Sequence, residues 1–278
     1  MPQASASDIT NRLRPVSGRH NPLLKDLRGV YAKGVLTEEG CYAIEGVRLM
    51  EEAIRSGTKF RAVFFSDSAA GVMERLMSQI GRKVEALLVP AKLFKEVVTS
   101  ETPQGVAGLV YAKESSLEKV LLGDPSPMLV VAAGLQDPGN LGTILRSAEA
   151  FGAAGVLLGE GTASVYNPKT VRATAGSIFR MPAIPTKLVD AIPQLREHGV
   201  RLIATSSHKG TPLDQAQLGG PAAFFIGNEG AGLPPELNQQ MDEFFAIPQS
   251  KSVESLNAGI AASIILYEAA RQRRSKSS

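Results

Sequence analysis

Residues 128–152 read MLVVAAGLQDPGNLGTILRSAEAFG, and they set the architecture of the second half of the chain. The first six residues are continuously apolar, as in a strand that is buried on both faces. A polar, glycine-rich loop follows, and the apolar spacing beyond it is that of a helix. A strand, a loop and a helix in this order form the repeating unit of a parallel α/β sheet.

The same alternation continues to the end of the chain. Further short apolar runs without clean polar alternation are typical of parallel strands, and they occupy residues 155–158, 182–185, 200–204, 222–226 and 244–247. Helical spacing fills the gaps, with a last helix expected over residues 255–274. We therefore predict a domain over residues 128–278 with a mostly parallel sheet covered on both faces.

The first part of the chain mixes strands and helices less regularly. Strands are expected at residues 41–44, 62–65, 84–89 and 105–111, with helices over 46–56 and 72–81. This pattern predicts a smaller α/β/α domain over residues 1–112. Serine, glycine and proline gather in residues 113–127, which we interpret as a linker with a short amphipathic helix at 117–122.

The composition excludes several classes of protein. Of 278 residues, 44% are hydrophobic and 21% are charged, which is typical of a globular chain. No apolar run reaches the roughly 18 to 20 residues of a membrane helix, and residues 1–15 lack the apolar core of a secretory signal. The single cysteine, Cys41, is interpreted as a packing residue, and a cytoplasmic location is expected.

Motifs of common enzyme classes are missing from the sequence. The three histidines are scattered and match no metal-ligand spacing, so no metal is expected. No GxSxG elbow, GxGxxG fingerprint or Walker lysine occurs, which leaves a hydrolase, a dinucleotide cofactor and a nucleoside triphosphate unsupported.

The positive charge is concentrated near the N-terminus. The net charge is +3, and residues 1–28 carry five basic against two acidic side chains, whereas the other 250 residues carry 25 of each. Such a cluster is a weak indicator of binding to a phosphate backbone. On charge alone, a solvated N-terminal arm is an equally good interpretation.

Three loops contain polar residues and glycines beyond what packing demands. In a parallel α/β sheet, ligands bind at the carboxyl ends of strands, where such loops lie. The loop after residue 133 contains Asn140, a possible helix cap, and Arg146 near the start of the helix, where a cation is disfavoured unless an anion is bound there. The loop after residue 226 has three glycines around Glu229, and the third, near residue 255, carries Ser255 and Asn257. A surface arginine, a flexible turn and helix capping are the alternatives for the three loops.

Together the three loops resemble the SpoU/TrmH family of RNA ribose 2'-O-methyltransferases, within the SPOUT superfamily. The first loop resembles motif 1 with Asn140 and Arg146, the IGNEG segment at residues 226–230 resembles motif 2, and IP followed by SLN at residues 247–257 resembles motif 3. The segments HNPLLK at 20–25, AIEGVRL at 43–49 and TPQGV at 102–106 are similar to the substrate-binding domain that precedes the catalytic domain in many members. The resemblance covers nearly the whole chain.

The resemblance implies a fold, a cofactor and a quaternary structure. The fold would be a SPOUT-type α/β domain with a C-terminal trefoil knot, preceded by an RNA-binding domain similar to a ribosomal-protein type. The cofactor would be S-adenosylmethionine, and the protein would act on RNA as a homodimer in which each site borrows from the partner subunit. The residues implied in cofactor binding are Thr205, Gly227, Asn228, Gly230, Ile247 and Leu256.

The resemblance also implies roles for single residues. Asn140, Arg146, Glu229, Ser255 and Asn257 would form the catalytic set. A guanidinium stays protonated, so we expect Arg146 to bind phosphate and stabilise developing alkoxide charge, with Glu229 orienting it or accepting the proton. The RNA contacts expected in the first domain are Arg14, Arg19, Asn21, Lys25 and Arg28.

The target is expected to be ribosomal RNA of the large subunit. A tRNA ribose methyltransferase and an inactive RNA-binding protein with the same scaffold are the alternatives, and base methylation is a further one. The chain departs from the family pattern at Gln249 and Lys251, on a loop expected near the cofactor. These two positions leave the shape of that loop and the substrate preference open.

Overall fold

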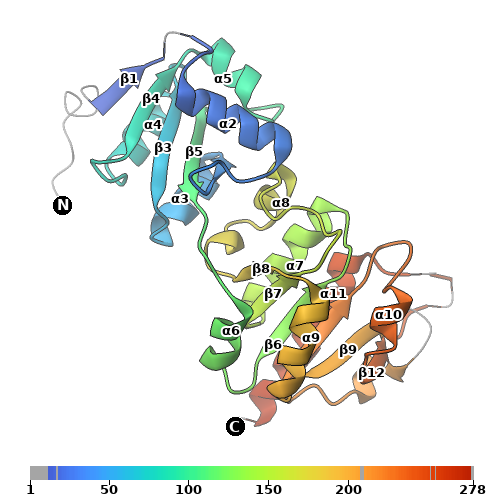
Figure 1. Ribbon diagram of the computed structural model, residues 1–278. Helices are drawn as coiled ribbons and strands as arrows, with labels where there is room; N and C mark the ends of the chain where they lie inside the picture. The colour runs from blue at the N-terminus through green and yellow to red at the C-terminus, as the bar shows by residue number, and fades with distance from the viewer. Residues whose placement is uncertain (1–11, 17, 207–209, 251, 254, 277–278) are drawn as a thin grey trace. The chain divides into compact units, whose positions relative to one another are not determined.

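The computed structural model describes residues 12–276 except residues 17, 207–209, 251 and 254. The chain forms two compact units (Figure 1). The first unit holds the chain up to Lys113 together with Tyr166–Phe179, and the second holds Glu114–Val165 and the chain from Arg180 onward. The chain therefore passes between the units three times, at residues 113/114, 165/166 and 179/180. Lys251 lies outside the described residues.

The first unit is built on a mixed five-stranded sheet. Its strands, in the order β1-β4-β3-β5-β2, are β1 (Leu13–Pro15), β4 (Glu85–Val89), β3 (Phe60–Ser66), β5 (Val106–Tyr111) and β2 (Cys41–Glu45). β1, β4 and β3 run parallel, whereas β5 pairs antiparallel with both β3 and β2. The central strands are buried almost throughout, and Cys41 is 1% exposed, as expected of a packing residue.

Helices cover both faces of this sheet. α2 (Pro22–Lys33) packs with α5 (Ala91–Val97), and α3 (Val47–Arg55) packs with α4 (Ala70–Met77) (Figure 1). α2, which the sequence analysis did not anticipate, begins at the Asn21 cap followed by Pro22 and ends at Gly34 with φ 64°. Such a start and stop are local signals that any helix can use. The predicted α/β/α layering of this unit is confirmed.

One segment from the second half of the sequence belongs to the first unit. α8 (Pro168–Ala173) and the 3-10 turn at Ser177–Phe179 pack there. The ring of Tyr166 lies 5.2 Å from that of Tyr42, and Arg172 Nη1 donates to Thr99 Oγ1 at 3.0 Å. The sequence analysis had placed all of residues 128–278 in a single domain, so this grouping differs from the expectation.

The second unit is built on seven strands that all pair in parallel. Their order is β10-β12-β9-β11-β6-β7-β8. The strands are β6 (Met128–Ala132), β7 (Gly155–Leu158), β8 (Ala183–Pro185), β9 (Arg201–Ser206), β10 (Thr211–Pro212), β11 (Ala222–Ile226) and β12 (Glu243–Ala246). The parallel sheet expected from the continuous apolar runs is thus confirmed.

Both faces of the large sheet are covered. α7 (Pro138–Ala150) packs against α11 (Ala258–Lys276). α6 (Leu117–Gly123) and α9 (Leu188–Glu197) share a core with the strands on the other face. Leu117 and Leu121 of α6 lie in this core. Most of the segment interpreted as a linker is therefore packed into the second unit.

The remaining short helices and the helix boundaries add little to the picture. α10 (Pro235–Asn238) and the 3-10 turn at Leu213–Gln215 lie in connections between strands. The last helix begins at Ala258, three residues later than expected, because Asn257 caps it. Among the described helices, none has the length and apolarity needed to cross a bilayer. The trefoil knot stays a prediction.

Candidate active site

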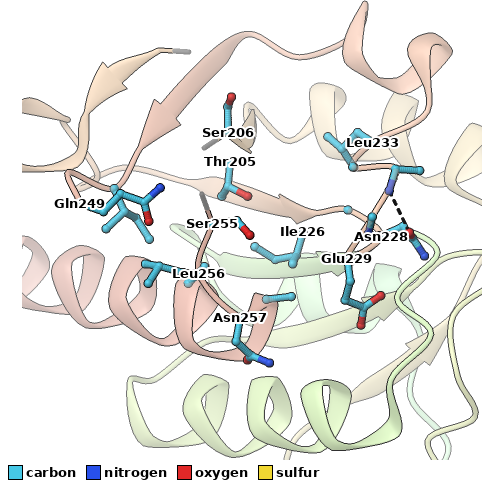
Figure 2. Close-up of a pocket in the computed structure, with 17 residues that line it drawn as sticks. Thr205, Ser206, Ile226, Asn228, Glu229, Leu233, Gln249, Ser255, Leu256 and Asn257 are labelled. Carbon is cyan, nitrogen blue, oxygen red and sulfur yellow. Dashed lines mark hydrogen bonds between the residues drawn. The ribbon is translucent and has the colours of Figure 1, made fainter. Parts of the chain in front are cut away.

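A cavity of about 620 Å³ opens at the carboxyl ends of β9, β11 and β12 (Figure 2). This volume is in the range of about 300 to 1,000 Å³ that is typical of small-molecule sites. Nine of the predicted site residues line it: Thr205, Gly227, Asn228, Glu229, Gly230, Ile247, Ser255, Leu256 and Asn257. All of them belong to the second unit, and the second and third loops identified in the sequence meet here.

The loop after β11 is a tight hairpin held by its own backbone. Asn228 and Gly232 exchange two backbone hydrogen bonds, at 3.0 and 2.9 Å. The Asn228 Oδ1 atom accepts from the backbone N–H groups of Gly230 and Ala231, both at 3.0 Å, and its Nδ2 donates to the carbonyl of Gly134 at 3.0 Å. The asparagine therefore shapes the hairpin and ties it to the loop after β6.

The first glycine of this hairpin has no room for a side chain. A Cβ atom on Gly227 would lie 2.4 Å from the carbonyl carbon of Gly232 and 2.6 Å from the backbone nitrogen of Leu233. Glycine lets two backbone segments approach this closely. The backbone edge of the hairpin consequently lines the cavity, where a ligand can meet main-chain groups rather than side chains.

Glu229 links this hairpin to the start of α7. Its Oε1 atom accepts from the backbone N–H of Asp137 at 3.2 Å and from Nδ2 of Asn140 at 3.0 Å, while Oε2 accepts from the backbone N–H of Gln136 at 3.3 Å. Partial burial raises the pKa of Glu229, but the hydrogen bond from Asn140 and those from backbone N–H groups outweigh it, so the net pKa lies below the usual value. Glu229 is therefore ionised at neutral pH and is a weak base.

Asn140 extends the link to the third loop. Its Oδ1 atom accepts from Nδ2 of Asn257 at 2.7 Å, and Asn140 itself is 8% exposed. The Asn257 Oδ1 atom accepts from the backbone N–H groups of Gly259 and Ile260, and so caps α11. The side chains Glu229–Asn140–Asn257 form one hydrogen-bonded chain across all three loops, which we call the polar chain. Asn140 and Arg146 do not line the cavity themselves.

The expectation that Asn140 caps α7 is wrong. The cap is Asp137, whose Oδ1 accepts from the backbone N–H of Asn140 at 2.8 Å. Pro138 takes the first helical position, so the helix begins three residues earlier than the sequence analysis placed it. Asn140 is thereby released from capping, and its amide is used for Glu229 and Asn257.

Arg146 lies farther into the helix than expected. It is the ninth residue of α7, more than two turns beyond the cap, where the field of the helix terminus has faded. Its side chain is exposed. The electrostatic argument for a bound anion is therefore weaker than the sequence indicated, and no hydrogen bond within the described part of the chain joins Arg146 to Glu229.

Residues that sequence reasoning missed complete the wall. Among them are Ser206 and Ala231; Gln249, which was expected on a loop near the cofactor, also lines the cavity. The structure indicates that Gln249 faces a ligand site, because its Oε1 atom is buried and accepts no hydrogen bond from the residues described. The only sequence signal was that Gln249 departs from the family pattern.

The composition of the cavity suits S-adenosylmethionine. Ile247 and Leu256 supply apolar wall, hairpin backbone supplies donors and acceptors, and the buried Gln249 oxygen awaits a donor. Glu229 is the one charged side chain among the described lining residues, so a ligand with a cationic centre meets no repulsion. Across the described ranges, no group of three or more potential metal ligands is found.

The five RNA contacts expected in the first unit are placed on its surface, with varied partners. Arg14 and Arg19 form exposed ion pairs with Glu85 at 3.2 Å and Glu96 at 2.7 Å. The Asn21 side chain accepts from Leu24 N at 3.2 Å as the cap of α2. Lys25 is exposed and Arg28 half-buried on the same helix.

Arg12, which was counted in the basic excess, has a structural contact instead. Its guanidinium donates to the backbone carbonyls of Met77, Ile80 and Gly81, at 2.9 to 3.2 Å, beyond the end of α4. Met77 is the last residue of α4, where a carbonyl lacks a helical partner, whereas the Gly81 carbonyl also accepts from the backbone N–H of Val84 at 3.0 Å. Arg12 keeps its positive charge, but its guanidinium donors are used within the first unit.

Comparisons with known proteins match both halves of the chain. The SpoU rRNA Methylase family matches residues 127–267, and the MRM3-like substrate binding domain matches residues 21–108. The chain is 31% identical to the 23S rRNA (guanosine(2553)-2'-O)-methyltransferase RlmP of Bacillus subtilis, over 92% of this chain and 98% of that protein.

Solved structures are similar over the same length. The AdoMet-bound rRNA methyltransferase of Sinorhizobium meliloti is 31% identical with a TM-score of 0.81, and the match covers 94% of this chain and 98% of that one. The SpoU methyltransferase AviRb of Streptomyces viridochromogenes, in complex with AdoMet, is 27% identical with a TM-score of 0.80, covering 92% and 99%.

Proposed function

This chain belongs to the SpoU rRNA methylase family, and from that membership we propose that it transfers a methyl group from S-adenosylmethionine to a ribose 2'-hydroxyl of large-subunit ribosomal RNA. The resemblance drawn from the three loops is thereby confirmed at the level of the family. The observation that carries the proposal is the polar chain, which joins the three loops beside a cavity of suitable size. A ribosomal substrate implies a cytoplasmic location.

The cavity is proposed to hold the cofactor, whose sulfonium supplies the methyl group. Thr205 and the hairpin residues Gly227, Asn228 and Gly230 would contact it at one wall, with Ile247 and Leu256 at another. Ser255 and Asn257 lie at the start of α11 on the same cavity. Hairpin backbone and apolar side chains exclude water from the bound group, which favours a reaction that develops charge.

Glu229 is proposed to position groups rather than to accept the proton. Its two oxygens already receive three hydrogen bonds, and these lower its pKa. A carboxylate held in this way gives up its donors only at a cost, and its low pKa makes proton capture unfavourable. We assign Glu229, with Asn140 and Asn257, the role of fixing the three loops relative to one another.

Arg146 is proposed to act in the site of a second copy. Its exposed side chain does not line the cavity of its own chain. A guanidinium delivered from outside would bind the phosphate beside the reacting ribose and stabilise the developing alkoxide. This role needs two copies of the chain, and that is the homodimer implied by the family.

An exposed apolar stripe on α11 supports such a dimer. Ile260, Ile264 and Tyr267 are 51%, 36% and 50% exposed, at spacings of four and three residues that place them on one helix face. Exposed apolar residues gathered on one face are typical of an interaction surface. Sedimentation of I264D should give monomers where the unaltered protein gives dimers, and a dimeric I264D would contradict this surface.

RNA is proposed to bind through the first unit. Lys25 stands exposed on α2, and the ion pairs of Arg14 and Arg19 are exposed pairs, worth roughly 0 to 1 kcal/mol, that RNA phosphates can replace. Binding should weaken steeply with salt because counterions are released. RNA titrations at two salt concentrations compare the unaltered protein with a variant in which Arg14, Arg19 and Lys25 are replaced by glutamine; equal affinity of both proteins would refute the assignment.

The reaction is tested with labelled S-adenosylmethionine and total RNA from a strain that lacks the enzyme. Label in a 2'-O-methylated nucleotide of large-subunit RNA is expected, and label in tRNA or in a base would move the chain to another class. R146A should lose methyl transfer while S-adenosylhomocysteine affinity stays nearly intact. R196A, an exposed arginine of α9 on the other face of the sheet, is the matched control.

A further inference from the structure

Gln249 is a half-buried polar residue to which the proposed roles assign no part, and its Oε1 atom is buried. It follows β12 in the loop Ile247–Pro248–Gln249, and it lines the cavity (Figure 2). Its Oε1 atom is shielded from solvent and has no hydrogen-bond donor within the described chain.

An acceptor in this state is costly to the protein. Burial removes the hydrogen bonds that water would give, and each unmet buried polar group costs roughly as much as a lost hydrogen bond. Such groups are rare in folded proteins, and a ligand that donates a hydrogen bond removes the cost. The Gln249 oxygen is therefore suited to a ligand with a donor at this point of the cavity.

The place of Gln249 in the cavity narrows the chemistry of that donor. Figure 2 shows Gln249 and Leu256 at one side of the cavity and Glu229 at the opposite side. Methyl transfer belongs to the end with the polar chain, so a group that does not react occupies the Gln249 end. This end also has apolar wall from Ile247 and Leu256.

Three parts of the cofactor carry donors and do not react: the amino-acid tail, the ribose and the adenine. The ribose is bonded through its C5' atom to the sulfonium, so its hydroxyls lie near the transferred methyl group and not at the far end of the cavity. A zwitterionic tail needs charged or multiple polar partners, and no described lining residue near Gln249 is charged. A flat, largely apolar ring with one amino group matches apolar walls and a single amide. The observations therefore favour adenine.

We propose that Gln249 recognises the adenine of S-adenosylmethionine, with Oε1 accepting a hydrogen bond from the exocyclic amino group. Gln249 is then a specificity-determining residue of this chain, placed where the family pattern has a different side chain. The assignment rests on the proposed function, because it takes S-adenosylmethionine as the ligand of the cavity. It predicts that the same side chain destabilises the unliganded protein and strengthens the complex.

The test compares Gln249→Met with the unaltered protein by calorimetry, using two ligands. One is S-adenosylhomocysteine, and the other is its analogue with purine in place of adenine, which lacks the amino group. The unaltered protein should bind the purine analogue about five- to tenfold more weakly, as expected for one lost hydrogen bond. The Q249M variant should bind both ligands with equal affinity, close to that of the weaker complex.

A second readout separates recognition from a structural role. The melting temperature of unliganded Q249M should equal or exceed that of the unaltered protein, because an unmet acceptor is removed. A residue needed for structure would lower the melting temperature and weaken both ligands alike. Q249L repeats the test with a different apolar shape, and Q239M replaces an exposed glutamine that does not line the cavity.

The possible failures are distinguishable. The assignment of Gln249 is overturned if Q249M keeps full affinity for S-adenosylhomocysteine or loses the same factor for both ligands. It is also overturned if the unaltered protein does not distinguish the two ligands. An unaltered protein that binds neither ligand would overturn the proposed cofactor, and the assignment with it.

Discussion

Replacing Asn140 by aspartate tests the polar chain with almost no change of shape. In the structure, Asn140 Nδ2 donates to Glu229 Oε1 at 3.0 Å, and its Oδ1 accepts from Asn257 at 2.7 Å. An aspartate keeps the acceptor for Asn257. It replaces the donor by a carboxylate oxygen, so two acceptors that both carry negative charge face each other at about 3 Å.

The repulsion can be bounded from this distance. Two unit charges about 3 Å apart repel by about 1.4 kcal/mol in bulk water and by about 5.5 kcal/mol at an effective dielectric constant near 20. The N140D variant lies between these limits, because Glu229 is exposed whereas position 140 is 8% exposed. Repulsion raises the folded-state pKa of one carboxyl of the pair above its unfolded value.

The sign of the pH dependence follows from that raised pKa. Below the unfolded pKa, near 4, both states hold the proton and the shared proton restores a hydrogen bond between the carboxyls. As the pH rises toward the folded-state pKa, that stability is lost. The deficit of N140D should therefore grow between about pH 4 and pH 7 and then level off.

The assay is thermal unfolding across pH 5 to 8, with methyl transfer measured at pH 8. N140A is the control: it loses both hydrogen bonds at every pH, a deficit of about 2 kcal/mol that should not vary over this range. Both variants should lose most of their methyl transfer. An N140D deficit that is the same at pH 5 and pH 8, or unaltered stability at pH 8, would refute the role given to the polar chain.

Three further substitutions test single contacts. G227A should lower S-adenosylhomocysteine affinity at least about tenfold, because its Cβ would lie 2.4 Å from backbone across the hairpin, whereas G220A, with open space around it, should bind normally in the same calorimetry. R12A should lower the free energy of unfolding by about 1 to 3 kcal/mol in urea melts, since the carbonyls of Met77 and Ile80 lose the arginine donor, whereas that of Gly81 keeps the N–H of Val84. L121A should cost about 2 to 4 kcal/mol and L122A almost nothing, because the first side chain is buried in the second unit and the other is 73% exposed.

The sequence predicted those features that depend on local pattern. The strands of the second unit are continuous apolar runs, and each is followed by a loop whose glycines or caps are visible in the residue order. Asn167 followed by Pro168 is a local signal for the start of a helix, and α8 begins there. Such signals involve residues a few positions apart, so no knowledge of the tertiary structure is needed to use them.

Features that depend on distant parts of the chain could not be predicted in this way. Nothing in Tyr166–Phe179 shows that it packs with the first unit, because its partners Tyr42 and Thr99 are some 70 to 120 positions away. Both Asp137 and Asn140 could cap α7, and contacts with residues outside the helix decide which of them does. Asp137 caps, while Asn140 is drawn to Glu229 and Asn257.

Helix caps and the polar chain together explain how polar side chains are held around the cavity although few of them are charged. Asp137 and Asn257 are helix caps, and Asn228 caps the hairpin turn, so local structure fixes three of the polar side chains around the cavity. Asn140 then connects the hairpin to the start of α11, because its side chain bonds both Glu229 and Asn257. Because these groups satisfy one another, the side chains of Glu229, Asn140 and Asn257 are held in place without a ligand, and a ligand does not bear the entropic cost of ordering them.

The cavity itself is poorly suited to bind RNA phosphates, so other surfaces must supply the affinity for RNA. The described lining of the cavity has one charged side chain, and it is negative. Phosphate must therefore be attracted elsewhere, by the first unit and by Arg146 on the exposed side of α7. Of the basic residues near the N-terminus, Arg12 uses its guanidinium donors at the end of α4, so fewer basic groups can contact RNA phosphates directly than the sequence count indicates. A salt dependence that is weaker than the basic count implies is accordingly the expected behaviour, and Lys25 and the exchangeable Arg14 and Arg19 set its size.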